Sequence, residues 1–148
     1  MADGMSFNVA KQGFMEMTQE ITTGYKALCE SADKQVESIS VAETLEFANR
    51  NDMVLVDIRD IRELNRDGRI PGAIHAPRGM LEFWIDPASP YHKEVFAQDK
   101  SYVFMCAGGM RSLLATKTAQ DMGMKPVLNL SGGFKAWKEA GGAIEKKD

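Results

Sequence analysis

Cysteine and histidine are both scarce in this chain of 148 residues, which contains two of each. The cysteines, Cys29 and Cys106, stand far apart and show no CxxC spacing. These side chains are too few to build a zinc site, so we expect no structural metal and no bound cofactor. The spacing does allow a disulfide between the two cysteines, but a reducing cytosol keeps most thiols free.

Long apolar runs are also missing. No stretch approaches the roughly 18 residues that a bilayer span needs. The N-terminus lacks the basic region and the apolar region of a secretory signal. We therefore expect a cytoplasmic protein with no membrane partner. The chain has a net charge of −3 and no basic stripe interleaved with aromatic residues, so nucleic acid is a poor candidate partner.

The acidity belongs to the N-terminal part of the chain. Residues 1–39 hold six acidic residues and three lysines, whereas residues 40–148 hold 15 acidic and 15 basic residues. Hydrophobic residues make up 44% of the chain and charged residues 26%, a balance that is typical of a globular protein with a buried core. We therefore divide the chain into an N-terminal helical extension, residues 1–38, and a domain body, residues 39–148.

Five apolar residues of the extension recur at spacings of three and four, which is typical of one face of an α-helix. They are Phe14, Met17, Ile21, Tyr25 and Leu28. Left bare, such a face would be an exposed apolar patch, so it needs something to pack against. We expect the helix to pack on the domain body. The alternative is a self-association or partner helix, for example in a homodimer.

The body alternates strand patterns with helix patterns. Short apolar runs rich in β-branched residues predict three buried strands: 53–58, 102–106 and 127–130. Helical patterns predict three helices: 41–49, 112–122 and 133–140. Ser40 and Glu43 have the spacing of a capping box, and Gly123 suits the left-handed position after a helix. The order strand, helix, strand favours right-handed crossovers, and predicts an α/β fold with a parallel sheet and helices on both faces.

The segment Cys106-Ala-Gly-Gly-Met-Arg-Ser112 leaves a predicted strand and enters a predicted helix. Its two glycines let the backbone curl so that amide hydrogens point inward, and the helix N-terminus adds partial positive charge. Arg111 adds a full positive charge. Such a cradle favours the thiolate form of Cys106 and hence its reactivity as a nucleophile. The alternative is that Cys106 is a small buried core residue, which is where most free cysteines lie.

Four motifs follow one another along the body. They are Val56-Asp57-Ile58-Arg59, then Gly68-Arg-Ile-Pro-Gly-Ala-Ile74 with Pro77, then the Cys106 loop, and finally Leu130-Ser-Gly-Gly-Phe-Lys-Ala-Trp137. In order and spacing they resemble the rhodanese-like sulfurtransferases over about residues 39–145. One departure is Arg69, where that family usually has histidine, and we interpret it as surface variation.

The resemblance implies an open parallel sheet of about five strands and an activity in sulfur transfer. Cys106 would be the catalytic nucleophile. Its thiolate would take the outer sulfur of a small anionic donor such as thiosulfate, hold it as a persulfide, and pass it to cyanide, a thiol or a protein acceptor. The substrate-binding residues would be those of the loop: Ala107, Gly108, Gly109, Met110, Arg111 and Ser112.

Asp57 and Arg59 are expected to support this site. Asp57 follows the first core strand and is interpreted as a carboxylate that ties loops together, with an electrostatic role as the alternative. Arg59 either lines the substrate mouth or is a solvated charge. Arg111 has two open roles: it attracts the anionic donor, or it stabilises the loop through a bidentate ion pair with Asp57. We favour the ion pair.

Two other functions remain as alternatives. In the first, the domain is a persulfide carrier or a docking module with little turnover of its own. In the second, it is a cysteine phosphatase. Four residues stand between Cys106 and Arg111, whereas the related phosphatases have five, so the loop length favours sulfur transfer.

Overall fold

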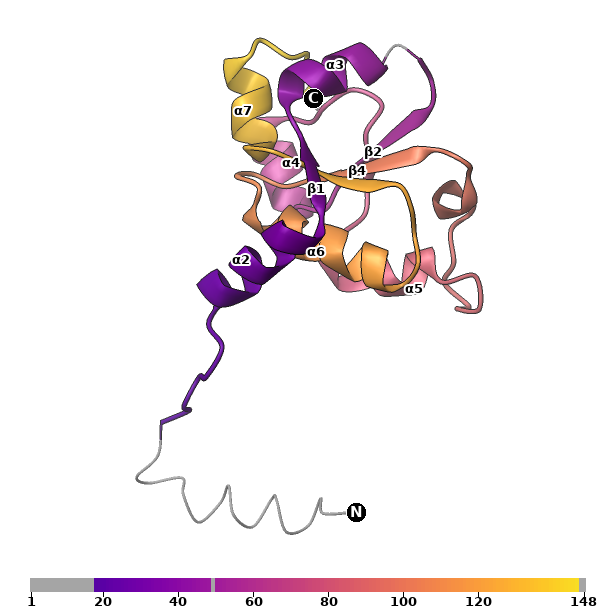
Figure 1. Cartoon of the computed structure of the whole chain (residues 1–148). Coiled ribbons are helices and arrows are strands. Elements are labelled where there is room, and N and C mark those ends of the chain that lie inside the picture. The colour runs from indigo at the N-terminus through magenta and orange to yellow at the C-terminus, as the bar shows by residue number, and fades with distance from the viewer. Residues whose placement is uncertain (1–17, 49, 147–148) are drawn as a thin grey trace.

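The structure, a computed structural model, describes residues 18–48 and 50–146 (Figure 1). Its centre is a parallel sheet in the strand order β1-β5-β4-β2-β3. The five strands are β1 (Glu37–Ile39), β2 (Met53–Asp57), β3 (Ile74–His75), β4 (Ser101–Met105) and β5 (Val127–Leu130). The three strands predicted from sequence are confirmed to within one residue at each end. Two short edge strands, β1 and β3, complete the sheet, and β1 crosses the predicted boundary between extension and body.

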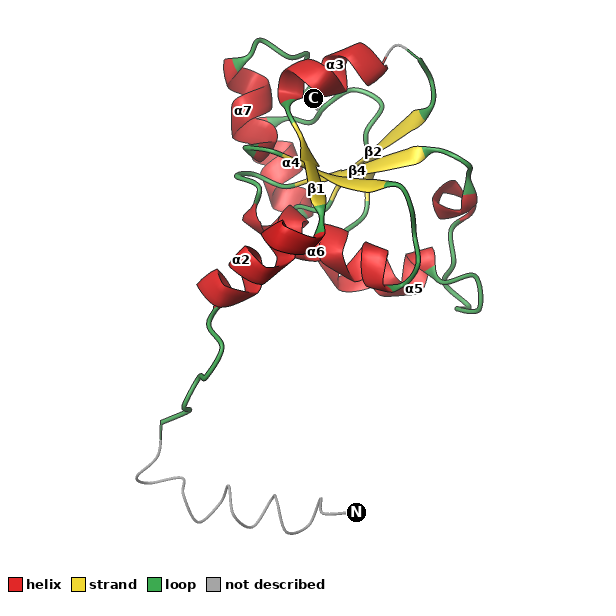
Figure 2. Cartoon of the chain, viewed as in Figure 1, coloured by secondary structure: helices red, strands yellow, loops and turns green. Residues whose placement is uncertain are grey.

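Helices cover both faces of the sheet, as Figure 2 shows. They are α2 (Tyr25–Gln35), α3 (Val41–Ala48), α4 (Ile61–Asp67), α5 (Leu81–Ile85), α6 (Met110–Asp121) and α7 (Gly133–Glu139), with 3-10 turns η1 (Arg78–Met80) and η2 (Glu94–Ala97). The cores on the two sides contain residues of α3 and α7 on one face and of α5 and α6 on the other. The predicted α/β class is therefore confirmed. None of the described helices is long and apolar enough to cross a membrane.

The continuous apolar run of β4 reflects burial on both faces. Tyr102 and Phe104 point into the core beneath α5 and α6, whereas Val103 and Met105 point into the core beneath α3 and α7. All four side chains are at most 2% exposed. Because strand side chains alternate between faces, a strand that is covered on both sides needs apolar residues at every position.

The N-terminal helix differs from the predicted one. Ile21 lies before α2 and is 74% exposed, and Tyr25 and Leu28 of α2 also face outward. The face that packs on α6 instead contains Cys29 and Ala32, because these small side chains let the two helices approach closely. Packing on the body is thus confirmed, but the predicted apolar face is wrong for these three residues. Phe14 and Met17 lie outside the described residues, and self-association through this helix stays a prediction.

The helix ends follow the predicted caps. The Ser40 hydroxyl accepts from the Glu43 amide at 3.1 Å, while the Glu43 carboxylate accepts from the Ser40 amide at 3.0 Å. Gly123 has a φ of +101°, in the left-handed region expected after a helix. The helix of the cysteine loop starts at Met110, two residues earlier than predicted, so Arg111 stands in its first turn.

The strand order has a switch point at the carboxyl ends of β2 and β4. From β2 the chain crosses to β3 on one side, and from β4 it crosses to β5 on the other side. The two connections diverge, which opens the position where parallel α/β sheets bind ligands. Asp57 ends β2, and Cys106 directly follows β4. The motifs chosen from sequence therefore meet at this edge of the sheet.

Candidate active site

Cys106 lies at the base of the loop that joins β4 to α6, and it is 1% exposed. Its sulfur accepts hydrogen bonds from two backbone amides: Gly109 N–H at 3.1 Å and Ser112 N–H at 3.4 Å. Gly109 has a φ of +103°, which lets its amide turn toward the sulfur without strain. The predicted inward-facing loop is present, and it surrounds the one thiol to which the motifs point.

The loop residues differ in exposure. Ala107 is half-buried, Gly108 and Met110 are exposed, and Ser112 is fully buried. The buried and exposed positions alternate because the chain curls around the sulfur as it enters α6. The sulfur therefore lies below a rim formed by the exposed residues Gly108 and Met110.

The start of α7 supports the loop from behind. Phe134 N–H donates to the Cys106 carbonyl at 2.8 Å, and Lys135 N–H donates to the Ala107 carbonyl at 3.0 Å. Gly133 makes this close approach, with a φ of +58°; a Cβ there would lie 2.4 Å from the Cys106 oxygen. The second glycine of the pair in the last motif is thus explained by contact with the cysteine loop.

The expected ion pair between Asp57 and Arg111 is wrong. Asp57 instead pairs with Arg59, whose Nη2 lies 2.8 Å from Oδ2 and whose Nε lies 3.0 Å from Oδ1. Both side chains are 1% exposed, so Arg59 neither lines a substrate mouth nor is a solvated charge. Just after β2 the chain turns, and this turn brings the two side chains together. The supporting role expected of Asp57, a carboxylate that ties loops together, agrees with this geometry.

Arg59 joins three parts of the site. Besides Asp57, its Nη2 donates to the Gly68 carbonyl at 3.0 Å, at the end of α4. Its guanidinium also lies 4.2 Å from the centre of the Phe134 ring. A cation held over an aromatic face in a buried position is stabilised by the ring electrons. Through Phe134, whose amide bonds Cys106, this buried arginine supports the base of the cysteine loop.

Arg111 forms its ion pair with Glu63 of α4. Its Nη1 and Nη2 donate to the two Glu63 oxygens at 2.8 and 2.9 Å. These hydrogen bonds lower the pKa of Glu63 and raise the pKa of Arg111, so both groups stay charged. The predicted cation therefore stands in the loop, but its partner comes from another helix.

Glu63 is a residue of the site that we did not predict. Its carboxylate also accepts from the Asp60 amide at 3.1 Å, which completes a capping box at the start of α4. The Asp-x-x-Glu spacing is visible in the sequence and indicates a helix start. It does not show that the same carboxylate reaches Arg111, which is 48 residues away.

The remaining cysteine and the histidines lie apart from this chemistry. Both cysteines are free, and Cys29 is half-buried in the contact of α2 with α6. His75 Nε2 lies 2.7 Å from the Arg59 carbonyl, and His92 Nδ1 lies 3.0 Å from the Trp84 carbonyl. Within residues 18–48 and 50–146 no group of three His, Cys, Asp or Glu side chains gathers where a metal ion would bind.

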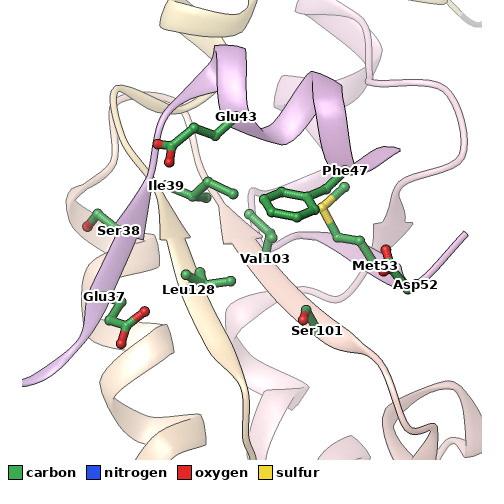
Figure 3. A pocket seen from close by; sticks show the side chains of 10 residues that line it. All are labelled: Glu37, Ser38, Ile39, Glu43, Phe47, Asp52, Met53, Ser101, Val103 and Leu128. Atoms are coloured by element: carbon green, nitrogen blue, oxygen red, sulfur yellow. The ribbon is translucent and has the colours of Figure 1, made fainter. Parts of the chain in front are cut away.

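A cavity of about 310 Å³ lies at the other edge of the sheet (Figure 3). Phe47 of α3 points into it toward Val103 and Leu128 of the sheet. The full lining is Glu37, Ser38, Ile39, Glu43, Phe47, Asp52, Met53, Ser101, Val103 and Leu128. Because it includes the first residues of β1, β2 and β4, the cavity belongs to the amino ends of the strands, and Cys106 takes no part in it.

Comparison with known proteins agrees with this geometry. The family model described as the rhodanese-like domain matches residues 40–140 of this chain. A protein of Allochromatium vinosum named sulfurtransferase is 32% identical over 107 residues, which is 72% of this chain and 90% of that protein. The thiosulfate sulfurtransferase GlpE of Pseudoalteromonas translucida is 31% identical over 102 residues, which is 69% of this chain and 89% of that protein.

A solved structure from Rhodopseudomonas palustris is more similar in sequence. It is 55% identical, covers 87% of this chain and 99% of its own, and superposes with a TM-score of 0.84. It is described as a protein of unknown function and a possible tyrosine phosphatase. The family match covers β2 to β5, the cysteine loop and the supporting start of α7, and so this chain belongs to the rhodanese-like domain family.

Proposed function

We propose that this protein is a sulfurtransferase that carries sulfane sulfur as a persulfide on Cys106. The observation that carries the proposal is the thiol itself, which accepts two backbone N–H bonds in a loop that also presents Arg111. Amide donors and a nearby guanidinium can stabilise the negative charge that develops on sulfur during a displacement. Relatives that bear the name sulfurtransferase support the same activity.

The proposed reaction has two displacements. In the first, the Cys106 thiolate attacks the outer sulfur of thiosulfate; a bond forms between the two sulfurs, and the bond to the sulfonate group breaks. Sulfite leaves with that electron pair. In the second, cyanide or a thiolate attacks the outer sulfur and the Cys106 thiolate leaves, so the enzyme returns to its starting state. No net oxidation or reduction is needed.

The loop residues 107–112 are proposed to bind the donor and the persulfide. The outer sulfur of the persulfide would stand above the Cys106 sulfur, where the exposed rim at Gly108 and Met110 admits the substrate. Amide donors in a fixed loop stabilise charge as an oxyanion hole does. We further propose that the acceptor is a small thiol, cyanide or a protein thiol, and that the protein works in the cytoplasm.

The direct test is intact mass after incubation with thiosulfate. A persulfide adds about 32 Da, the mass of one sulfur atom, and the gain should disappear on treatment with cyanide. A protein that never gains this mass is not a thiosulfate-dependent sulfurtransferase. A protein that gains it, but turns over slowly with cyanide and with small thiols, is the carrier or docking module instead.

A cysteine phosphatase is the second candidate, because of the description of the Rhodopseudomonas palustris protein. The loop places four residues between Cys106 and Arg111, and such a loop is tight for a phosphoryl group. In the same experiment we therefore expect negligible hydrolysis of an aryl phosphate. Robust hydrolysis that Cys106→Ser abolishes would replace the sulfurtransferase proposal with the phosphatase.

The pair of Arg111 and Glu63 gives a second prediction. Arg111→Lys keeps the charge but loses the bidentate geometry, so kcat for thiocyanate formation should fall about tenfold. Glu63→Gln should cause a similar loss, and the double variant should be no worse than the worse single variant. Steady-state kinetics measure all three.

The matched control is Arg62→Lys, because Arg62 is a largely exposed cation at the start of α4, the helix that contains Glu63. It should leave kcat unchanged. If Arg111→Lys raises KM instead, and the rise grows with added salt, then Arg111 acts by long-range attraction of the donor. Additive losses in the double variant would likewise contradict a joint role for Arg111 and Glu63.

A further inference from the structure

A chain of polar side chains runs from Cys106 into the apolar interior. The Cys106 thiol donates to Ser112 Oγ at 3.4 Å, and the Ser112 hydroxyl donates to Oδ1 of Asn129 at 2.6 Å. Ser112 is 0% exposed and Asn129, on β5, is 5% exposed. Buried polar groups normally have a hydrogen-bond partner. Here Ser112 contacts the Cys106 sulfur directly, and Asn129 is linked to that sulfur through Ser112.

The direction of these bonds depends on the charge of the sulfur. A serine hydroxyl has one proton, and the carbonyl oxygen of Asn129 at 2.6 Å can only accept, so this contact requires that proton. A lone pair of Ser112 then faces the sulfur, which suits a neutral thiol that donates. A thiolate or a persulfide anion can only accept. With the hydroxyl unchanged, a lone pair would then face an anion in a buried site, which is unfavourable.

We propose that Ser112 and Asn129 form a two-state relay that reverses its hydrogen bonds when Cys106 becomes charged. In the charged state the side-chain amide of Asn129 turns over, its Nδ2 donates to Ser112 Oγ, and the hydroxyl donates to the sulfur anion. No covalent bond changes in this step. Asparagine suits the task, because its carbonyl and its NH₂ group exchange places by rotation about one bond.

The relay involves the proposed nucleophile, Cys106, and its role in catalysis rests on the proposed function. Asn129 acts through Ser112, so it is a positioning residue. The charged groups around the sulfur are two ion pairs, Arg111 with Glu63 and Asp57 with Arg59, and the exposed Lys135 on α7. Both arginines already have a carboxylate partner and the two loop amides are fixed by the backbone, so the Ser112 hydroxyl is the group that can change its hydrogen bond when the sulfur becomes charged.

The side-chain NH₂ signals of Asn129 in ¹⁵N–¹H spectra test the relay directly. They are recorded from acidic to alkaline pH in the full chain carrying Cys29→Ser, so that Cys106 is the only thiol. We expect these signals to shift in one step at the same pH at which alkylation of Cys106 by iodoacetamide accelerates. The exposed Asn65 in α4 is the matched control, and its signals should stay constant through that step.

The relay makes the shift depend on Ser112 and on Cys106. In Ser112→Ala and in Cys106→Ser the Asn129 step should vanish. If the Asn129 signals stay constant while Cys106 becomes reactive, the relay is wrong. The relay is also wrong if the step persists in Ser112→Ala, because the charge on the sulfur would then act on Asn129 directly and not through Ser112. Neither readout needs sulfur transfer, so failure of the relay is distinguishable from failure of the proposed function.

Alkylation rates supply the second arm. Ser112→Ala should lower the rate at neutral pH about tenfold, since a hydrogen bond to a charged group is lost. In that background Asn129→Leu should change the rate by less than about twofold, because the hydroxyl through which it acts is gone. Independent, multiplying losses from the two substitutions would overturn the proposal, and thermal melting identifies any variant that fails to fold.

Discussion

Cys106→Ser is expected to reduce thiocyanate formation from thiosulfate and cyanide by about 1,000-fold or more. A hydroxyl in place of the thiol cannot form the persulfide, whatever the surrounding loop contributes. Cys106 is also the position on which the loop amides converge, so the serine variant keeps the cradle and loses only the nucleophile. A colorimetric thiocyanate assay and intact mass after thiosulfate measure the two steps separately.

The control for this prediction is Cys29→Ser. Cys29 is half-buried in the contact of α2 with α6 and is a free thiol. We expect its replacement to leave both turnover and the mass gain nearly unchanged. Substantial turnover by Cys106→Ser would remove Cys106 from the mechanism, whereas a large loss in Cys29→Ser would make Cys29 a second thiol of the reaction.

Arg59→Leu is expected to destabilise the fold by about 3–5 kcal/mol, because it leaves the carboxylate of Asp57 buried without its partner. Both side chains of this pair are 1% exposed, so water cannot replace the lost hydrogen bonds. The substitution also removes the bond to the Gly68 carbonyl and the contact with the Phe134 ring. Urea denaturation of the purified variant measures the loss in the free energy of unfolding.

Arg62→Ala is the matched control for the stability measurement. Arg62 is paired with Asp60, but its side chain is 86% exposed, and exposed pairs contribute little. Its removal should therefore leave the denaturation midpoint in place. A loss below about 1 kcal/mol in Arg59→Leu would show that water or a rearranged side chain satisfies Asp57, and would contradict the structural role of the pair.

Local patterns in the sequence were sufficient to predict much of this fold. The strand that becomes β4 was recognisable because burial on both faces makes its run apolar at every position. The start of α3 was recognisable because Ser40 and Glu43 satisfy each other's amides within one turn. The cysteine loop was predictable for a similar reason, because its glycines and the helix that follows determine the conformation of adjacent backbone residues. Each of these features depends on interactions within a few residues.

The short edge strand β3 and the partner of Arg111 were not predictable in this way. β3 contains only Ile74 and His75 and is defined by its pairing with β2. Two residues are too few to show the hydrophobic periodicity by which a strand is recognised in a sequence. From the sequence we expected Asp57 as the partner of Arg111, and Glu63 was not considered. The turn after β2 places Asp57 in an ion pair with Arg59, and Arg111 pairs with Glu63 instead.

The sequence alone therefore determined the α/β class, the edge of the sheet that carries the site, and the identity of the candidate nucleophile. Only the tertiary structure decided which charges pair, which face of α2 packs on α6, and that Asn129 stands behind Ser112. The physical reason is the range of the interactions. Backbone curvature, caps and burial periodicity act between near neighbours in the chain, whereas ion pairs and buried polar contacts join residues that only folding brings together.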